Sequence, residues 1–161
     1  MTPLCAALLA KTDEQIERTA HLIALIPSGV DELGGLLGHL LDCHAGICAA
    51  LAAALPAHRA MFDDLRALPV NHACPPDKAL RRIAQYRARI ADAFAALTDA
   101  ELARPIPTVF VPEGEAVLTL LLGNLEHLIN HKHELFTRLK QMGVAVATRD
   151  LYRLRGTPAI E

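Results

Sequence analysis

The stretch LLLGNLEHLINHKHELFTRLKQMG, residues 120–143, decides the fold. It is rich in leucine, contains no proline, and ends at Gly143, a residue type preferred just beyond the last turn of a helix. The sequence therefore predicts a long helix from about Glu115 to Met142. This helix is the last of four long ones that the chain is expected to form.

Prolines and capping residues divide the rest of the chain into three more long helices. Pro27 ends the first helix, and Ser28 can cap the second, with two acidic residues in the first turn, where the helix dipole favours negative charge. Proline is also favoured at the start of a helix, which places the beginning of the third helix near Pro76. The expected ranges are Pro3 to Leu25, Ser28 to Leu55, and Pro76 to a residue before Pro105.

The connections between these helices differ in kind. A short helical piece from His58 to Leu68 and a proline-containing loop make the link between the second and third helices long, which permits a crossover instead of a tight hairpin. Thr108 to Val111 lies between prolines and is an extended-looking segment before the fourth helix. The residues after Gly143 are expected to lie back on the helices. We therefore predict one all-α domain over residues 1–161, a four-helix bundle of the antiparallel type with these two connections.

The composition supports helices and argues against two other classes of protein. Hydrophobic residues make up 52% of the 161 residues, aromatic residues only 4%, and tryptophan is absent. Alanine and leucine must therefore build the core, and they favour helices over strands. The 16 Lys and Arg against 18 Asp and Glu give a formal net charge of −2, unlike the basic surface of a nucleic-acid-binding protein. A β-sandwich and a nucleic-acid partner are both disfavoured.

The cysteines and the apolar segments indicate the cellular compartment. No two cysteines form a CxxC pair, and a helical domain of this size does not need disulfide bonds; the four are Cys5, Cys43, Cys48 and Cys74. The N-terminal segment MTPLCAALLAKTDEQ lacks the basic start and the cleavage site of a secretory signal. Charged residues or histidine interrupt every apolar run before it could span a bilayer. We expect a soluble cytoplasmic protein that does not act at a membrane.

Two histidines of the last helix have a spacing that suits metal binding. His127 and His131 are four residues apart, so their side chains lie about 40° apart around the helix axis and both imidazoles can reach one ion. His133 points about 200° away from His131 and cannot join them. A pair of this kind can equally be two partly buried or surface histidines, so by itself it leaves both interpretations open.

The second helix offers a third histidine. His39 lies on a stripe of small residues, which lets another helix approach closely or leaves a cavity over the ring. The other members of the stripe are Gly35, Cys43, Gly46 and Ala50. His44 lies about 140° from His39 around the helix, so only one of the two can face a given site. We choose His39 because of its small neighbours.

Two stretches, LLGHLLDCHAG (residues 36–46) and HLINHKHELFTRLKQMG (residues 127–143), resemble the DinB/YfiT-like family of metal-dependent helical-bundle proteins. In that family a histidine in a GHL context supplies one metal ligand, and an H-x3-H pair near the end of the last long helix supplies two more. The resemblance implies that the ligands here are His39, His127 and His131. It covers nearly the whole chain in the order and length of its helices.

Three neutral imidazoles on one divalent ion leave a coordination position open, as in catalytic metal sites. Zinc and nickel are the ions we expect first, and iron also suits these ligands. Glu134 could hydrogen-bond the free ring nitrogen of a ligand, and Asp42, near His39, is a second candidate for this role. Cys43 could complete a histidine–cysteine site. The alternatives are solvated carboxylates for the two acids and a small buried thiol for the cysteine.

The resemblance implies a metal-dependent enzyme, because characterised relatives include thiol-dependent transferases and isomerases that use low-molecular-weight thiols. The ion would activate such a thiol, or a water for hydrolysis, and the substrate would be a small molecule. One alternative is a non-catalytic metal-binding or stress-related bundle; another is a bundle whose histidines are relics and whose role is dimerisation. The leucine-rich fourth helix has more apolar width than one neighbour needs, and with the resemblance this favours a homodimer.

Overall fold

The computed structural model describes residues 1–68, 71–109 and 111–154. Within these ranges the chain is mostly helical, so the prediction of an all-α protein is confirmed. The long helices are α1 (Pro3–Ala24), α2 (Gly34–Ala54), α4 (Pro76–Ala96) and α6 (Val117–Gln141). The short elements are the 3-10 helices η1 (Pro56–Phe62) and η2 (Thr148–Leu151), the helices α3 (Asp63–Arg66) and α5 (Asp99–Ala103), and the strands β1 (Pro105–Ile106) and β2 (Glu115–Ala116).

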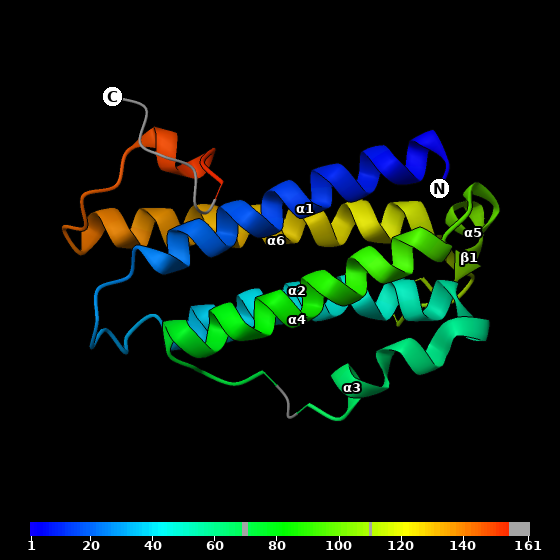
Figure 1. Ribbon diagram of the computed structural model, residues 1–161, viewed down its shortest axis with the longest axis horizontal. Helices are drawn as coiled ribbons and strands as arrows, with labels where there is room; N and C mark the ends of the chain where they lie inside the picture. The colour runs from blue at the N-terminus through cyan, green and yellow to red at the C-terminus, as the bar shows by residue number, and fades with distance from the viewer. Residues whose placement is uncertain (69–70, 110, 155–161) are drawn as a thin grey trace.

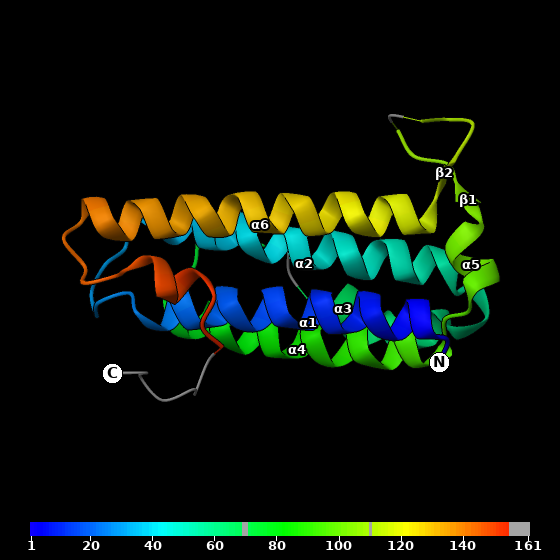
Figure 2. The ribbon, with the colours of Figure 1, turned by 90° about the horizontal axis from the view of Figure 1, so that it is seen from above.

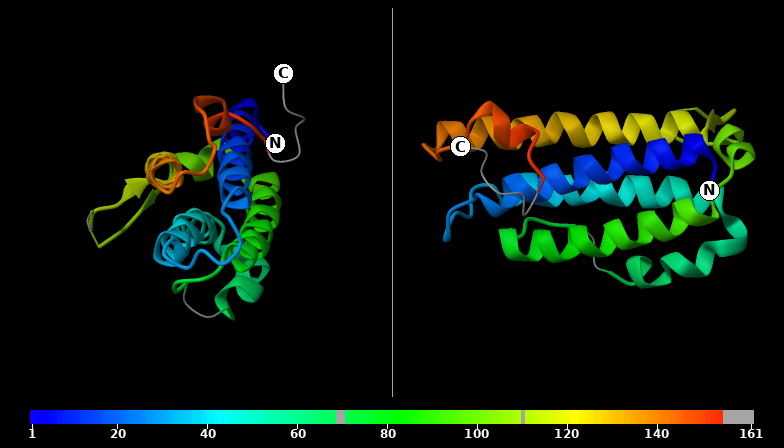
Figure 3. Two further views of the ribbon diagram at one scale, coloured as in Figure 1. Left: turned by 90° about the vertical axis from the view of Figure 1, so that its left-hand side faces the viewer. Right: turned by 45° about the horizontal axis from the view of Figure 1, so that its top comes forward.

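The long helices lie side by side (Figure 1). Both α1 and α2 pack against α4 and against α6, so each long helix has two long neighbours, as the end-on view in Figure 3 shows. Helices α2 and α4 run in the same direction, because η1, α3 and the following loop carry the chain back along the length of the molecule (Figure 1). The crossover that the sequence permits is therefore present. Helices α1 and α6 also run in the same direction, so the bundle is antiparallel for the pairs α1–α4 and α2–α6 and parallel for the other two (Figure 1).

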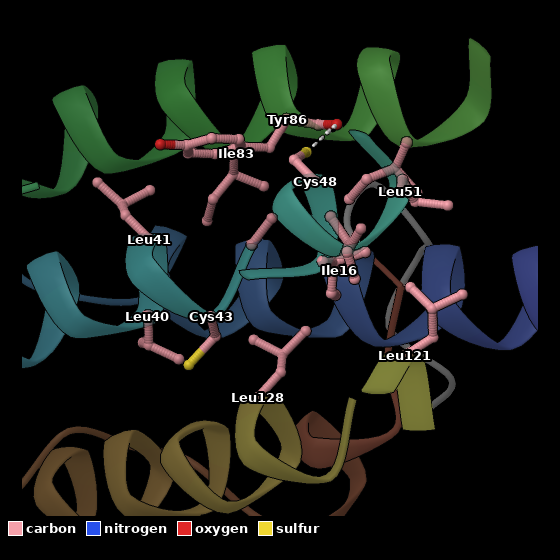
Figure 4. Packing of buried hydrophobic residues seen from close by; sticks show 14 of the residues in the cluster. Ile16, Leu40, Leu41, Cys43, Cys48, Leu51, Ile83, Tyr86, Leu121 and Leu128 are labelled. Atoms are coloured by element: carbon pink, nitrogen blue, oxygen red, sulfur yellow. Dashed lines mark hydrogen bonds between the residues drawn. The ribbon is translucent and has the colours of Figure 1, made fainter. Parts of the chain in front are cut away.

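Small and branched aliphatic side chains fill the space between the long helices (Figure 4). Leu40, Leu51 and Leu128 are completely buried, and Ala79 and Ala93 of α4 are as well. Such interdigitated packing stabilises a core without large aromatic residues. Among the described residues, α2 alone is long and apolar enough to cross a membrane, but 56% of its most apolar stretch is buried inside the protein, as in a core helix of a soluble protein.

The expected boundaries of the long helices are confirmed to within about two residues, except the start of the second helix, which is wrong. Helix α4 begins at Pro76, and Gly143, with φ +78°, follows the end of α6. Helix α2 begins at Gly34 and not at Ser28. The physical reason is that the chain turns first: Gly29 has φ +81°, and the amide of Gly34 donates to the carbonyl of Asp31. Ser28 therefore does not cap this helix.

A hairpin projects from the end of the molecule where α6 begins (Figure 2). Its strands are antiparallel, with Ile106 opposite Glu115. The predicted extended segment Thr108–Val111 is therefore part of the loop that joins the strands and not of the strands themselves. Thr108 and Val111 instead hold the loop, since the amide of Thr108 donates to the Val111 carbonyl and the Val111 amide to the Thr108 hydroxyl. Phe110, inside the predicted segment, lies outside the described residues.

The segment after α6 lies back on α1, as the sequence predicts (Figure 1). Leu151 is buried, and its carbonyl accepts a hydrogen bond from the Lys132 ammonium. His21 of α1 contacts Asp150, with 3.2 Å between Nε2 and Oδ1. Burial lowers the pKa of Lys132 to about 8, which marks this junction as partly desolvated.

Candidate metal centre

Helices α2 and α6 bring three imidazole rings together at one point. Nε2 of His39 lies 3.2 Å from Nε2 of His127 and 3.0 Å from Nε2 of His131. One ring nitrogen from each residue lies within 4.8 Å of the other two. His127 is exposed, and both contacts of His39 lie at the surface, so a small molecule can reach the cluster from solvent. The three histidines singled out in the sequence are therefore neighbours, although His39 is 88 and 92 residues from its partners.

The register of each helix explains the convergence. Residues 127 and 131 are one turn apart on α6 and face α2 together. The side chain of Asn124 of α6 lies directly over Gly46 of α2, where a β-carbon would clash with its Oδ1. Gly46 belongs to the predicted small-residue stripe of α2. Gly35, another member of that stripe, has nothing within 4 Å of its β-position. Only part of the stripe therefore has a close neighbour.

Two of the three separations between the ring nitrogens fit a small divalent ion, and the third, between His127 and His131, lies within 4.8 Å. Imidazole nitrogens bound to a tetrahedral ion at about 2.0–2.1 Å lie about 3.3 Å from one another. The two Nε2 separations from His39, 3.2 and 3.0 Å, are close to this value. A set of three imidazoles also matches zinc, nickel and iron better than magnesium or calcium, which prefer oxygen ligands. The residues present therefore fit a transition metal ion.

Glu134 fixes the orientation of one ring. Its Oε2 lies 3.0 Å from Nδ1 of His131, and its Oε1 accepts two hydrogen bonds from the guanidinium of Arg138. A neutral histidine that donates from Nδ1 carries its lone pair on Nε2, the atom that faces the other two rings. The Arg138 guanidinium, with His131 adding to it, holds the pKa of Glu134 below its usual value, so the carboxylate stays available as an acceptor.

The protonation state of His127 also favours metal binding. Burial, followed by the charges of His131 and His39, lowers the pKa of His127 below its ordinary value. The imidazole of His127 is therefore neutral at pH 7, which is the form that binds a metal ion.

Asp42 and Cys43, the other two candidates around the site, have different environments. Oδ1 of Asp42 accepts a hydrogen bond from Asn71 of the crossover loop, so this carboxylate is directed to the loop. Cys43 is buried, and burial raises the pKa of its thiol to about 11. A protonated thiol is a poor metal ligand and nucleophile. Neither residue belongs to the cluster of ligand atoms formed by the three histidines.

The histidines set aside in the sequence lie away from the cluster. His133 is exposed on the outer side of α6. His44 is completely buried, and its Nδ1 lies 2.6 Å from the Leu40 carbonyl oxygen. Burial lowers the pKa of His44 to about 4. His44 is thus a neutral core histidine.

Two surroundings of the cluster were not visible in the sequence. The loop that holds Asn71 lies on α2 so closely that a β-carbon at Gly38 would be 2.6 Å from the carbonyl oxygen of His72. A groove of about 560 Å³ borders His127 on its other side and contains Glu115 of the hairpin. The first depends on a contact between segments distant in the chain, for which the isolated glycine was the one available signal. The second is formed by residues 115–127 alone.

Comparison with known protein families identifies the family of this chain. A sequence model described as the DinB superfamily matches residues 5–135, which is most of the chain and includes all three histidines and Glu134. Comparisons with curated proteins and with solved structures found no match.

Proposed function

We propose that this chain, which belongs to the DinB superfamily, is a metal-dependent enzyme whose divalent ion is bound by His39, His127 and His131. The observation that carries the proposal is the convergence of three imidazole nitrogens from two helices, with His39 at separations from the other two that suit one ion. Two ring nitrogens at this distance repel each other unless one carries a proton or an ion lies between them, and an ion can satisfy all three rings at once. Zinc or nickel is the ion proposed first, and iron is also suitable.

The chain's own residues prepare the site for a small molecule. His131 is held by Glu134, and Glu134 by Arg138, so this ring keeps its direction. When bound, an ion with three protein ligands keeps a position open for a small molecule and lowers the pKa of a water or a thiol there. The exposed side of His127 gives that molecule access. We infer a transferase or isomerase acting with a low-molecular-weight thiol, or a hydrolase acting with water.

The proposal extends to the architecture and setting of the protein. The four long helices are those of a four-helix bundle, whose facing helices commonly supply metal ligands. Four free, buried cysteines suit a reducing cytoplasm. A homodimer would cover part of α6, on which Leu122 is 49% exposed. A single domain with a net charge of −2 suits small molecules better than nucleic acid.

Metal content tests the proposed site. The purified protein, prepared without a histidine tag, is expected to contain or to take up one divalent ion per chain. We expect His127→Ala to abolish tight binding and to leave the helical content unchanged, as measured by elemental analysis and circular dichroism. His133→Ala, on the same helix but outside the cluster, is the matched control and should bind as the wild type does. Stoichiometric binding by His127→Ala would show that the ligand set is wrong.

Turnover separates an enzyme from a binding protein. The metal-loaded protein is assayed for consumption of a thiol in the presence of an electrophile, and for ester and amide hydrolysis. We expect an activity that a chelator removes and that restored metal recovers. If metal binds stoichiometrically and none of these reactions is accelerated, the non-catalytic metal-binding bundle is the better description.

A further inference from the structure

The segment that follows α6 is attached to the bundle by polar contacts. Residues 144–154, which we call the C-terminal strap, lie over the seam between the second halves of α1 and α6 (Figure 2). Within the strap only Asp150 and Leu151 are buried. The carboxylate of Asp150 accepts a hydrogen bond from Nε2 of His21, at 3.2 Å, since a carboxylate cannot donate. The Leu151 carbonyl accepts from the ammonium of Lys132, at 3.4 Å.

The seam under the strap is polar, unlike the aliphatic contacts of α2 with its neighbours. Of the eight buried polar or charged side chains in the described part of the chain, six belong to α1, to Lys132 or to the strap. The ammonium of Lys132 also donates to Oε1 of Gln15, at 2.8 Å. When polar groups become exposed, water replaces their hydrogen bonds, whereas exposed aliphatic surface costs free energy in proportion to its area. The strap can therefore leave this seam more easily than two long helices can separate.

The strap is also a small unit of its own. It begins after Gly143, whose φ of +78° turns the chain back, and it lies beyond residue 135, where the match to the DinB superfamily ends. The carboxylate of Asp150 accepts a second hydrogen bond, from the amide of Ala147 at 2.8 Å, so one side chain both folds the 3-10 helix of the strap and attaches it to α1. A segment with few buried apolar side chains opens at a lower free energy than the core.

We propose that the strap is a two-state element that opens as a unit while the four long helices stay packed, and that the hydrogen bond between His21 and Asp150 holds it closed. Opening uncovers Lys132, whose side chain is buried in the closed state. This device is independent of the proposed metal centre, because none of these residues belongs to the cluster of three histidines. His131, the neighbour of Lys132 in sequence, contacts His39 of α2 and not the strap.

Chemical labelling of two buried side chains separates opening of the strap from unfolding of the bundle. An amine reagent acylates Lys132 when the strap is open, and a thiol reagent alkylates Cys43 of α2, which is 1% exposed, when the long helices separate. Peptide mass spectrometry of the metal-free protein measures both rates. Each rate is divided by the rate of the same residue in urea-unfolded protein, which gives its opening constant. In the wild type we expect the opening constant of Lys132 to exceed that of Cys43 by about tenfold or more.

The variant His21→Leu leaves the Asp150 carboxylate without its donor. We expect it to raise the opening constant of Lys132 about tenfold to a hundredfold, the effect of losing a hydrogen bond to a charged group, and to leave that of Cys43 unchanged. Asp150→Ala removes the same contact from the strap, outside the bundle, and should act in the same direction. Thr148→Ala, at an exposed position of the same 3-10 helix, is the matched control and should keep both wild-type constants.

Two results would overturn the proposal. If the opening constants of Lys132 and Cys43 are equal in the wild type, or rise together in the variants, the strap opens only when the bundle unfolds. If neither His21→Leu nor Asp150→Ala changes the opening constant of Lys132, the contact between His21 and Asp150 does not hold the strap closed.

Discussion

The carboxylate of Glu134 has two partners, and each uses one of its oxygens. Arg138 holds Oε1, and His131 lies against Oε2. We predict that Glu134→Ala weakens metal affinity about tenfold to a hundredfold, because the His131 ring loses its orientation and some basicity. Glu134→Gln should lie between this variant and the wild type, since an amide oxygen still accepts a hydrogen bond. Competition with a chelating dye measures the affinities.

A matched control for Glu134 is Glu113→Ala, which removes an exposed carboxylate from the hairpin, away from the three histidines. It should bind metal as the wild type does. Equal affinities for Glu134→Ala and the wild type would show that the contact with His131 is incidental to metal binding.

The buried His44 makes stability depend on pH. In the folded protein its pKa is lowered to about 4, whereas the unfolded value is about 6.5. Between these values the unfolded chain binds the additional proton, so stability is full above pH 6.5 and decreases as the pH falls towards 4, by as much as about 3 kcal/mol. Urea unfolding of the metal-free protein at pH 7 and pH 4.5 measures this loss.

The variant His44→Phe isolates that contribution. Phenylalanine fills a similar volume beside Tyr86, whose ring lies 6.2 Å from that of His44, and does not titrate. We expect a shallower decrease in the free energy of unfolding with falling pH than in the wild type. His58→Gln, at an exposed position, should keep the wild-type slope. If His44→Phe keeps it too, other groups account for the acid sensitivity.

At the scale of elements, the contact between α2 and the crossover loop depends on one glycine. A β-carbon at Gly38 would lie 2.6 Å from the oxygen and 2.8 Å from the carbon of the His72 carbonyl, and backbone cannot turn aside as a side chain can. We predict that Gly38→Ala lowers the free energy of unfolding by about 1–3 kcal/mol, the usual result of forcing atoms into a packed contact. The loop would have to leave α2, and the contact of Asn71 with Asp42 would be lost.

Gly35 of the same helix provides the comparison, because its β-position has nothing within 4 Å. Gly35→Ala should leave stability unchanged or raise it by up to about 1 kcal/mol, since alanine is the better helix former. Thermal unfolding of the two variants measures the difference. Equal stabilities would mean that the loop adjusts freely at Gly38.

What the sequence could predict at this scale was local. The start of α4 at Pro76 and the turn at Gly143 follow from the chemistry of single residues. The relative directions of His127, His131 and His133 follow from the helix period. The start of α2 could not be predicted in this way. Ser28 is a residue type that favours the start of a helix, but the chain turns between α1 and α2, and the helix begins only at Gly34.

The remaining features depend on contacts between distant segments. The hairpin pairs Pro105–Ile106 with Glu115–Ala116, and no pattern within either pair marks the other. The orientation of the Asp42 carboxylate depends on a hydrogen bond from Asn71, which is 29 residues away in a loop. The convergence of His39 with the α6 pair was inferred from a resemblance to a family, and periodicity alone left the choice open. The family match and the packing of α2 on α6 are consistent with that inference.

At the scale of the whole molecule, the proposed ion would join two halves of the chain. Helix α2 supplies one ligand and α6 supplies two, and 88 residues of chain separate the nearest of them. In the unfolded chain these histidines do not stay together, so metal binds the folded state in preference. Binding to one state alone stabilises it by about 4 kcal/mol when the free ion is a thousand times its dissociation constant.

We therefore predict that saturating zinc raises the melting temperature of the metal-free protein by about 8–16 °C, since 1 kcal/mol corresponds to about 2–4 °C for a chain of this length. Differential scanning calorimetry with and without a chelator measures the shift. His133→Ala should show the full shift, whereas His127→Ala should show little, because two ligands bind far more weakly than three. If both variants showed the same zinc-induced shift, His127 would not be a ligand of the stabilising ion, and the ion would bind elsewhere.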